Sequence, residues 1–346
     1  MPAPDFSAAY RAPWWLPGGN LQTVWPALFG RRGDGRPPRY RRMRWDTADG
    51  DFVDVDWLQE DDIASPPASA PGRPLLVLFH GLEGSSRSQY AEAFAAAAAQ
   101  RGWAFAVPHF RGCGGTLNRA PRAYHSGDFE EIGWLLQRLG DLHRQAHGDA
   151  PVLAVGVSLG GNALLRWAEE AGAAARRQAV AVAAVCSPID LAAGARAIGS
   201  GFNRHVYTRM FLASMKPKAL AKLAQFPGLF DAEALGAARD LHAFDDIFTA
   251  PLHGFRDAED YWARCSAGPR LGEIRLPALV LNALNDPFVP AASLPAAVRG
   301  EWVRLWRPAQ GGHVGFPAGA LPPGHVNAMP AAVCDWLAGH AAGAPR

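Results

Sequence analysis

Short apolar runs alternate with longer Ala- and Leu-rich segments along most of this 346-residue chain, and this alternation is the strongest constraint on its fold. Residues 41–45 and 52–57 flank the turn signal ADG at 48–50 and predict an opening hairpin. Because strands that alternate with helices build a mostly parallel sheet, we predict an α/β fold with an eight-stranded sheet flanked by helices. The other predicted strands are 75–79, 104–109, 152–157, 179–187, 278–283 and 303–307, and helical patterns between them include 88–101, 129–142 and 162–174.

One stretch, residues 189–271, carries helical patterns without a convincing strand. The strands on its two sides need each other to complete one core, so this stretch is predicted to be a helical cap inserted into a single domain spanning residues 1–346. Residues 1–40 form a Trp- and Pro-rich N-terminal segment. Asp128 and Glu131 also have the spacing of a capping box at the start of the helix predicted over 129–142.

The pentapeptide GVSLG at residues 156–160 matches the G-x-S-x-G pattern of a nucleophile elbow. Its glycines permit the tight turn from strand to helix that exposes a serine hydroxyl above a sheet. The predicted strand 152–157 and the helix-forming segment 162–170 provide that context. Ser158 is therefore the candidate nucleophile, with an ordinary glycine-rich turn as the alternative. A helix N-terminus beneath Ser158 would also favour developing negative charge.

A second glycine-containing loop, HGLEG at residues 80–84, follows the predicted strand 75–79. In folds that carry a nucleophile elbow, the corresponding loop gives one N–H donor of the oxyanion hole, and the residue after the nucleophile gives the other. We therefore predict the backbone amides of Leu82 and Leu159 as the two donors. The alternative is a structural turn in which His80 packs or hydrogen-bonds locally.

A serine nucleophile needs a histidine base, which in this kind of fold follows the last strand of the sheet. Of the eleven histidines, His313 lies in the glycine-rich loop GGHVG directly after the strand predicted over 303–307. His325 and His340 belong to the start and end of the final helical segment instead. We therefore predict His313 as the base.

The acid that orients the histidine should follow the preceding strand, and Asp286 lies in the tripeptide NDP just after residues 278–283. The tripeptide could also serve only as a turn before proline. Asp190, just after the strand predicted over 179–187, is the rival acid. We favour Asp286, so the predicted triad is Ser158, His313 and Asp286.

Charge and hydropathy narrow the possible partners. The 34 basic and 32 acidic residues give a net charge of +2, and the arginines form no basic run, so we expect no nucleic-acid partner. The most apolar run, 179–186, is less than half of the roughly 20 residues that cross a bilayer, so we expect no integral membrane segment. Four prolines interrupt residues 1–20, which do not resemble a secretory signal. We expect a cytoplasmic monomer.

The four cysteines, at positions 113, 186, 265 and 334, show no metal-ligand or redox spacing. We therefore expect no metal, no cofactor and no disulfide framework. Cys113 lies in the glycine-rich hexapeptide FRGCGG, and no base is predicted beside it. We interpret it as a small loop residue rather than a nucleophile.

With these residues in place, the sequence resembles the YheT-like branch of the α/β-hydrolase superfamily, which includes plant embryogenesis-associated esterases and yeast medium-chain acyl ethyl-ester synthases. The resemblance runs from about Pro13 to the C-terminus, and the three triad residues fall on the positions where this branch carries its own. Asn20 stands where a histidine is frequent, and Asn285 where an acidic residue is common. The matching segments are PWWLPGGNLQT (13–23), FRGCGG (110–115), YHSGD (124–128), FDD (244–246), PLHGF (251–255) and NALNDPF (282–288).

The resemblance implies that the protein hydrolyses small-molecule carboxylic esters, or transfers their acyl group, through an acyl-enzyme intermediate. The substrates that it implies are short- to medium-chain esters or glycerol esters. We expect hydrolysis to dominate, since water is abundant and no alcohol-binding motif is recognisable. A hydrolase fold that only binds ligands is the alternative from another class. Two local questions stay open. The N-terminal segment either lines the acyl pocket or packs against the core, and Arg111, Arg119 and Arg122 either hold an anionic head group or are solvated at the surface.

Overall fold

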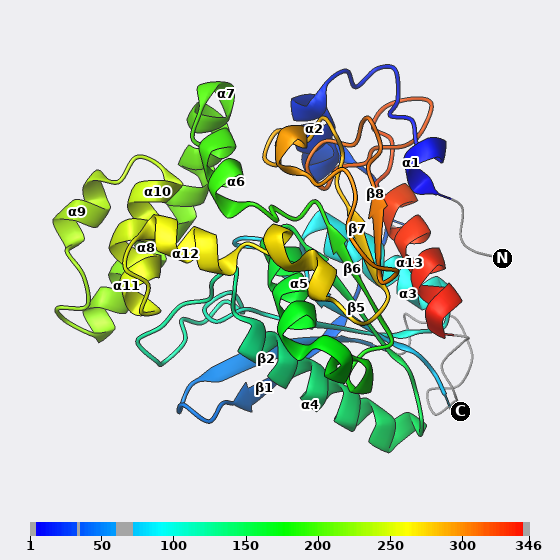
Figure 1. Cartoon of the computed structure of the whole chain (residues 1–346), viewed down its shortest axis with the longest axis horizontal. Helices are drawn as coiled ribbons and strands as arrows, with labels where there is room; N and C mark the ends of the chain where they lie inside the picture. Colours follow the sequence, from blue (N-terminus) through cyan, green and yellow to red (C-terminus); the bar gives the residue numbers. More distant parts are fainter. Residues whose placement is uncertain (1–4, 33–34, 60–71, 342–346) are drawn as a thin grey trace.

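The computed structural model describes residues 5–32, 35–59 and 72–341, so residues 1–4, 33 and 34 of the N-terminal segment lie outside the described residues. Within these ranges, eight strands form one sheet in the order β1-β2-β4-β3-β5-β6-β7-β8 (Figure 1). The predicted eight-stranded α/β architecture is confirmed. The strands are β1 Tyr40–Asp46, β2 Phe52–Leu58, β3 Leu75–Phe79, β4 Ala104–Pro108, β5 Val152–Val157, β6 Ala181–Val185, β7 Ala278–Leu281 and β8 Val303–Trp306.

The opening hairpin, β1 and β2, is antiparallel and joins the sheet through an antiparallel pairing of β2 with β4, whereas all other neighbours run parallel. The chain leaves β3 toward one side to form β4 and then returns to form β5 on the other side. Open α/β sheets bind ligands at such a reversal, beyond the carboxyl ends of the strands. Phe79 pairs with Gly156, so the loop after β3 and the turn after β5 begin side by side.

Helices cover both faces of the sheet, which explains why the central strands are apolar at every position rather than at alternate ones. Leu76 and Leu78 face the layer formed by α3 (Gln89–Gln100) and α13 (Ala328–Ala341). Leu75, Val77 and Phe79 face the opposite layer, formed by α4 (Phe129–His147) and α5 (Leu159–Ala171). The two layers bury the sheet between them (Figure 1).

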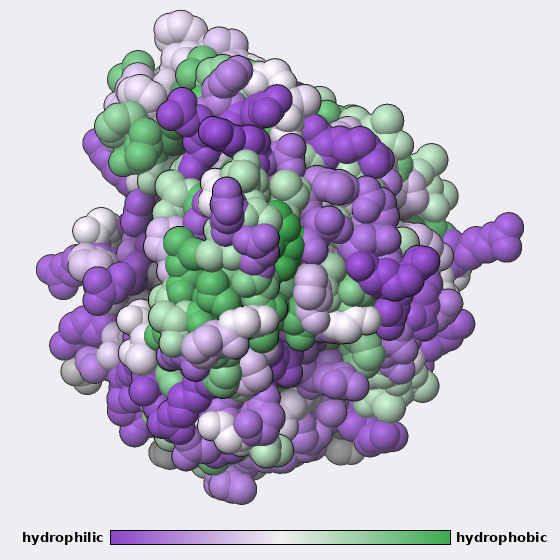
Figure 2. Space-filling model, turned by 90° about the vertical axis from the view of Figure 1, so that its left-hand side faces the viewer, coloured by the Kyte–Doolittle hydropathy of each residue, from purple (hydrophilic) through white to green (hydrophobic). Residues whose placement is uncertain are grey.

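The segment between β6 and β7 is helical and forms a lobe beside the sheet (Figure 1). The face that carries this lobe has a hydrophobic area in its middle, bordered by polar residues (Figure 2). No described helix is long and apolar enough to cross a membrane. Two helices precede the sheet, α1 Phe6–Ala9 and α2 Gly19–Phe29, and the lobe comprises α6 Leu191–Ile198, α7 Gly201–Asn203, α8 Arg209–Gln225, α9 Ala232–Ala237, α10 Leu241–Phe244, α11 Ala250–Leu252 and α12 Ala258–Cys265.

A buried ion-pair network fastens the loop after β4. Arg111 is only 7% exposed, and its guanidinium bonds Glu131 at 2.5 Å, Asp49 at 2.7 Å and Asp51 at 2.9 Å. The interpretation of Arg111 as a solvated surface charge is therefore wrong, since its guanidinium is buried among three carboxylates. Arg122, for which the same two alternatives were open, pairs with Asp128.

The predicted capping box at the start of α4 is wrong as well. Asp128 lies at the N-cap position, but its side chain makes no capping hydrogen bond to the helix. Instead, the carboxylate of Asp128 forms an ion pair with Arg122, and that of Glu131 forms one with Arg111. Charge-assisted bonds to arginine are stronger than bonds to a neutral amide, so the local capping pattern is overridden by tertiary pairing.

Arg111→Met should lower the free energy of unfolding by about 3–5 kcal/mol, because it leaves buried carboxylates without their cation. Urea denaturation followed by tryptophan fluorescence measures this change. Arg177→Met removes an exposed arginine and should change stability by no more than about 0.5 kcal/mol. Equal unfolding midpoints for the two variants would contradict a structural role for the network.

Candidate active site

Ser158 occupies a sharp turn between β5 and α5, with a backbone φ of 53° and ψ of −119°. A positive φ costs a non-glycine residue of order 1–3 kcal/mol and is held only where the surroundings enforce it. A Cβ added at Gly160 would lie 2.4 Å from the carbonyl oxygen of His80, and one at Gly156 would lie 2.4 Å from that of Gly160. These two glycines are therefore required for the turn, which presents the partly exposed Ser158 side chain at the N-terminus of α5.

The structure brings the three predicted triad residues together. His313 Nε2 lies 3.0 Å from Ser158 Oγ, and His313 Nδ1 lies 2.9 Å from Asp286 Oδ2. The other carboxylate oxygen, Oδ1, accepts hydrogen bonds from the backbone N–H groups of Phe288 at 2.8 Å and Val289 at 3.2 Å. The Asp286 carboxylate is thus fixed from both sides and orients the imidazole toward the serine.

The rival acid, Asp190, has a different role. It is the N-cap of α6, where its side chain accepts a hydrogen bond from the Ala193 N–H at 2.9 Å. Both aspartates follow a predicted strand, so this position alone did not exclude Asp190 as the acid. The structure places Asp286, and not Asp190, against His313.

Two backbone N–H groups lie beside Ser158. A Cβ added at Gly81 would lie 3.3 Å from Ser158 Cβ, so the loop at 80–84 packs directly on Ser158. Leu82, in this loop, and Leu159, the first residue of α5, line the same cavity as Ser158. Within the described chain, neither amide donates to another residue. The two residues predicted as donors therefore line the cavity that contains Ser158, and their N–H groups have no acceptor among the described residues.

His80 fixes the start of this loop. Its ring is fully buried, and burial lowers its pKa to about 3. The Phe110 N–H donates to Nε2 at 3.1 Å, so the proton of the neutral ring lies on Nδ1, which is 2.8 Å from the Gly81 carbonyl oxygen. His80 therefore makes the local hydrogen bonds that were expected if the loop at 80–84 were only a structural turn. The same loop also lies beside Ser158.

The cap is fastened to the same loop through Glu83, which has a positive φ of 58°. Tyr124 donates its hydroxyl proton to Glu83 Oε1 at 2.9 Å, and the Glu83 N–H donates to the same tyrosine oxygen at 3.0 Å. Lys218 of α8 pairs with Glu83 Oε2 at 2.8 Å. Sequence reasoning missed Tyr124 and Lys218, because nothing in their local pattern signals a contact across such distances along the chain.

The N-terminal helix α2 holds the loops that carry Asp286 and His313. Gln22 Oε1 accepts hydrogen bonds from Asn285 Nδ2 and from the Gly311 N–H, both at 2.9 Å. Thr23 Oγ1 accepts from the His313 N–H at 2.8 Å. The N-terminal segment was expected either to line the acyl pocket or to pack against the rest of the protein. Helix α2 packs against the loops that carry Asp286 and His313. The segment resemblance at residues 13–23 was the only sequence signal for this role.

Asn285 and Asn20, whose roles the sequence left undefined, each have a specific partner. Asn285 Oδ1 accepts from the Gly312 N–H at 3.0 Å, so it joins the acid loop to the histidine loop. Asn20 Oδ1 accepts from the hydroxyl of Tyr207, in the cap, at 3.0 Å. Both asparagines therefore act as connectors between elements that surround the site.

Cys186 lies beside the acid and base, and with Asp286 and His313 it forms a group whose ligand atoms fall within 4.8 Å. Such a group has the composition of a metal site. Burial and the nearby Asp286 carboxylate raise the thiol pKa far above its usual range, however, whereas a metal-bound cysteine must lose its proton. Both oxygens of Asp286 are also already bonded, so these residues fit a metal ion poorly.

Burial also raises the pKa of Cys113 to about 12, so its thiol stays protonated. Reactive cysteines have a lowered pKa. This agrees with the interpretation of Cys113 as a loop residue.

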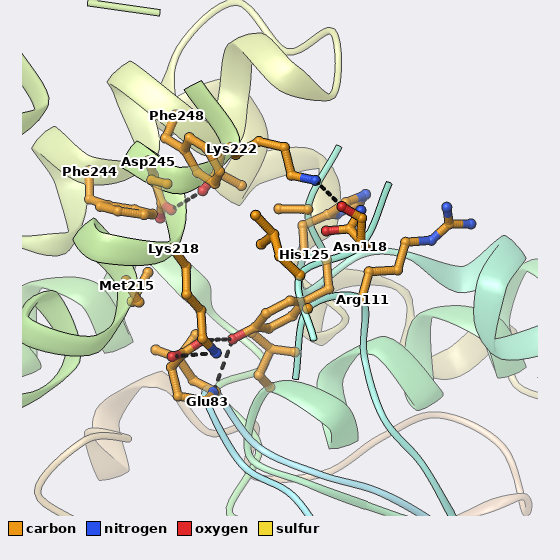
Figure 3. Close-up of a pocket in the computed structure, with 18 of the residues that line it drawn as sticks. Glu83, Arg111, Asn118, His125, Met215, Lys218, Lys222, Phe244, Asp245 and Phe248 are labelled. Atoms are coloured by element: carbon orange, nitrogen blue, oxygen red, sulfur yellow. Dashed lines mark hydrogen bonds and ion pairs between the residues drawn. The ribbon is translucent and has the colours of Figure 1, made fainter. Parts of the chain in front are cut away.

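Two cavities that share part of their walls lie at the candidate site, and Ser158 lines one of them. The serine pocket, about 690 Å³ including space open to solvent, is lined by Ser158, His313, Leu191, Ala195, Ile198 and Phe211, among others. The loop pocket, about 600 Å³ on the same basis, lies between the loop after β4 and the cap helices (Figure 3).

The family profile described as "alpha/beta hydrolase fold" matches residues 74–320. The chain belongs to the α/β-hydrolase family. This α/β hydrolase is 40% identical to the Escherichia coli (strain K12) protein described as "Putative esterase YheT" over 87% of this chain and 85% of that protein. The resemblance to the YheT-like branch is thereby confirmed.

More distant relatives carry lipid-related names. "Phospholipase ABHD3" of Homo sapiens is 27% identical over 87% of this chain and 75% of its own length. "Medium-chain fatty acid ethyl ester synthase/esterase 2" of Saccharomyces cerevisiae is 28% identical over 70% of this chain and 58% of its own. Among solved structures, the DcsB complex with its substrate analogue superposes with a TM-score of 0.53 at 13% identity, covering 88% of this α/β hydrolase and 100% of that chain, which shows the shared fold.

Gln22→Leu should loosen the loop at 311–313, because it leaves the buried Gly311 N–H without an acceptor. The free energy of unfolding should fall by about 1–3 kcal/mol. Hydrogen exchange of the Gly311 amide should accelerate, and the unfolding midpoint in urea should fall. Leu21→Ala alters an exposed neighbour on the same helix and serves as the control. Unchanged exchange at Gly311 in the Gln22 variant would contradict the anchoring role.

The lowered pKa of His80 predicts a specific pH dependence of stability. Between pH 6.5 and 3 the unfolded chain protonates this histidine and the folded chain does not, so acidification lowers the free energy of unfolding by about 1.4 kcal/mol per pH unit from this group. His80→Gln removes the contribution and should flatten the dependence by that amount. Urea denaturation of both proteins at pH 7, 6, 5 and 4 measures it, and parallel profiles would refute the assignment.

Proposed function

We propose that this α/β hydrolase is a serine esterase that cleaves carboxylic esters through an acyl-enzyme formed on Ser158. The observation that carries the proposal is the continuous hydrogen-bonded series from Ser158 Oγ through His313 to Asp286. The geometry is that of a nucleophile, a base and an orienting acid. The two unused N–H groups of Leu82 and Leu159 beside the serine support the same proposal, since acyl transfer develops negative charge on an oxygen.

The proposed reaction has two halves. Ser158 Oγ forms a bond to the ester carbonyl carbon while His313 Nε2 accepts its proton, and the carbonyl electron pair moves to the oxygen, which is stabilised by the Leu82 and Leu159 amides. When the C=O bond re-forms, the bond to the alcohol oxygen breaks and His313 returns the proton to that oxygen. Water then attacks the acyl-serine in the same way, with His313 again taking and returning the proton, and the carboxylic acid is released.

The relatives support this class of reaction. Their names include an esterase, a phospholipase and an ethyl ester synthase/esterase. We propose short- to medium-chain esters as substrates, with hydrolysis as the dominant outcome and alcoholysis as a minor one. Product analysis with ethanol added at low concentration separates the two, and mostly ethyl ester with little free acid would indicate an acyltransferase.

Ser158→Ala should lower kcat on p-nitrophenyl esters by a factor on the order of 10⁶, because loss of a triad serine removes the nucleophile. A fluorophosphonate probe should label the unmodified protein at Ser158 and leave the variant unlabelled, as mass spectrometry can show. Ser126→Ala, which changes another serine of the same pocket, is a matched control that should keep labelling at Ser158. Equal turnover by the Ser158 variant, or no labelling of folded native protein, would overturn the proposal in favour of a binding protein.

A further inference from the structure

The serine pocket and the loop pocket share part of their walls but differ in what they present to a reacting ester. Leu82, Leu159, Met215, Asp245 and Tyr261 line both cavities. Ser158 and His313 line only the serine pocket. An ester bound at Ser158 therefore has two directions in which its two arms can extend, and only one of them passes the imidazole.

The proposed esterase mechanism determines which pocket the acyl arm enters and which the alcohol arm enters, so this assignment rests on the proposed function. The leaving alcohol oxygen must take its proton from His313 Nε2, which places the alcohol arm on the histidine side. The carbonyl oxygen lies between the amides of Leu82 and Leu159, and both residues continue into the wall of the loop pocket. The acyl arm then extends past these two residues, away from His313.

The charges in the wall of the loop pocket are already paired within the protein. Lys218 pairs with Glu83, and Arg111 pairs with three carboxylates. Lys222 donates to the carbonyl oxygens of Asn118 at 2.6 Å and Ala120 at 2.9 Å and to Gln225 Oε1 at 2.9 Å, which uses all three of its N–H bonds. Figure 3 shows Lys218 directed toward Glu83 and Lys222 directed toward Asn118 around the cavity. A phosphate or carboxylate on the substrate would find no uncompensated cation there.

Asp245 lies where the two pockets meet, and its partners are neutral. Thr249 donates its hydroxyl proton to Oδ1 at 2.7 Å, and Trp262 donates its indole N–H to Oδ2 at 2.9 Å. Burial raises its pKa to about 6, so the site disfavours even this charge. Apolar side chains form much of the remaining wall, including Phe244 and Phe248 around the loop pocket and Leu191 and Phe211 around the serine pocket.

We propose that the loop pocket receives the acyl chain and the serine pocket the alcohol, so that the preferred substrate is an uncharged ester with an apolar arm on each side of the carbonyl. The ionic side chains of the loop pocket fasten the cap and do not bind substrate. The two arms are selected separately, by residues that belong to only one pocket each.

Matched substitutions test the assignment. Ala123 lines only the loop pocket and Ala195 only the serine pocket, and both are half-buried. We would measure kcat/KM of the native protein, Ala123→Leu and Ala195→Leu on ethyl esters from acetate to decanoate and on acetates from ethyl to decyl. Leu117→Ala and Ile198→Ala enlarge the same two pockets and provide a second pair, should the added side chains disturb folding.

Ala123→Leu should lower kcat/KM for ethyl octanoate relative to ethyl acetate by about tenfold for each methylene excluded, and change octyl acetate less than twofold. Ala195→Leu should show the reverse pattern. The enlarging variants should shift each preference toward longer chains. A swapped pattern, or equal effects on both series, would overturn the assignment while turnover by the native protein upholds the esterase itself. If native protein turns over no ester and resists the fluorophosphonate probe, the proposed function fails first.

Esters with neutral and charged chain ends test the preference for an uncharged substrate. Acyl chains of equal length that end in a methyl, a carboxylate or a trimethylammonium group should give at least tenfold higher kcat/KM for the methyl-terminated ester than for either charged one. A carboxylate-terminated chain accepted as well as the methyl-terminated one would show that the pocket cations are available to substrate. Preference for trimethylammonium would identify Asp245 as a binding group for cations. Either result would overturn the uncharged class.

Discussion

The pairing of β3 with β5 at the centre of the sheet is the interaction on which the site depends. Both strands are apolar along their whole length and buried from both faces, so their register is fixed by packing on two sides. That register sets the loop at 80–84 and the turn at Ser158 next to each other. Gly160 then approaches the carbonyls of Phe79 and His80 so closely that no Cβ fits between them. Strand pairing and close backbone contacts thus place Ser158 beside the loop at 80–84, and the buried His80 side chain fixes the start of that loop.

The remaining parts of the site are held differently. Asp286 and His313 follow β7 and β8, and side-chain hydrogen bonds from α2 fix their loops. The cap is fastened by Lys218 and by the nearly fully buried Lys222, both on α8, which bond to loops at the edge of the sheet. One half of the site is therefore set by strand pairing, and the other half depends on individual polar contacts that a single substitution can remove.

This division explains how much the sequence predicted. Strand positions, sheet type and the residues brought together at Ser158 all follow from apolar runs and glycine-rich turns, which depend on neighbours in the chain. Gln22, Tyr124 and Lys218 could not be found in this way, because their partners lie far away in the sequence. The capping box failed for the same reason: Asp128 and Glu131 satisfy a local pattern, but two arginines of the preceding loop compete for their carboxylates and win.

The contact between Gln22 and Gly311 spans 289 positions, which has a consequence for synthesis in the cell. A ribosome that adds roughly 5–20 residues per second makes the second partner about 15–60 seconds after the first. For most of that interval α2 lacks both of the loops to which Gln22 bonds, since Asn285 is made only shortly before Gly311. The strand and helix units in the middle of the chain can assemble earlier from neighbouring segments. Helix α2 is therefore synthesised before every strand of the sheet, yet it reaches its final packing only after the loop that follows the last strand has been made.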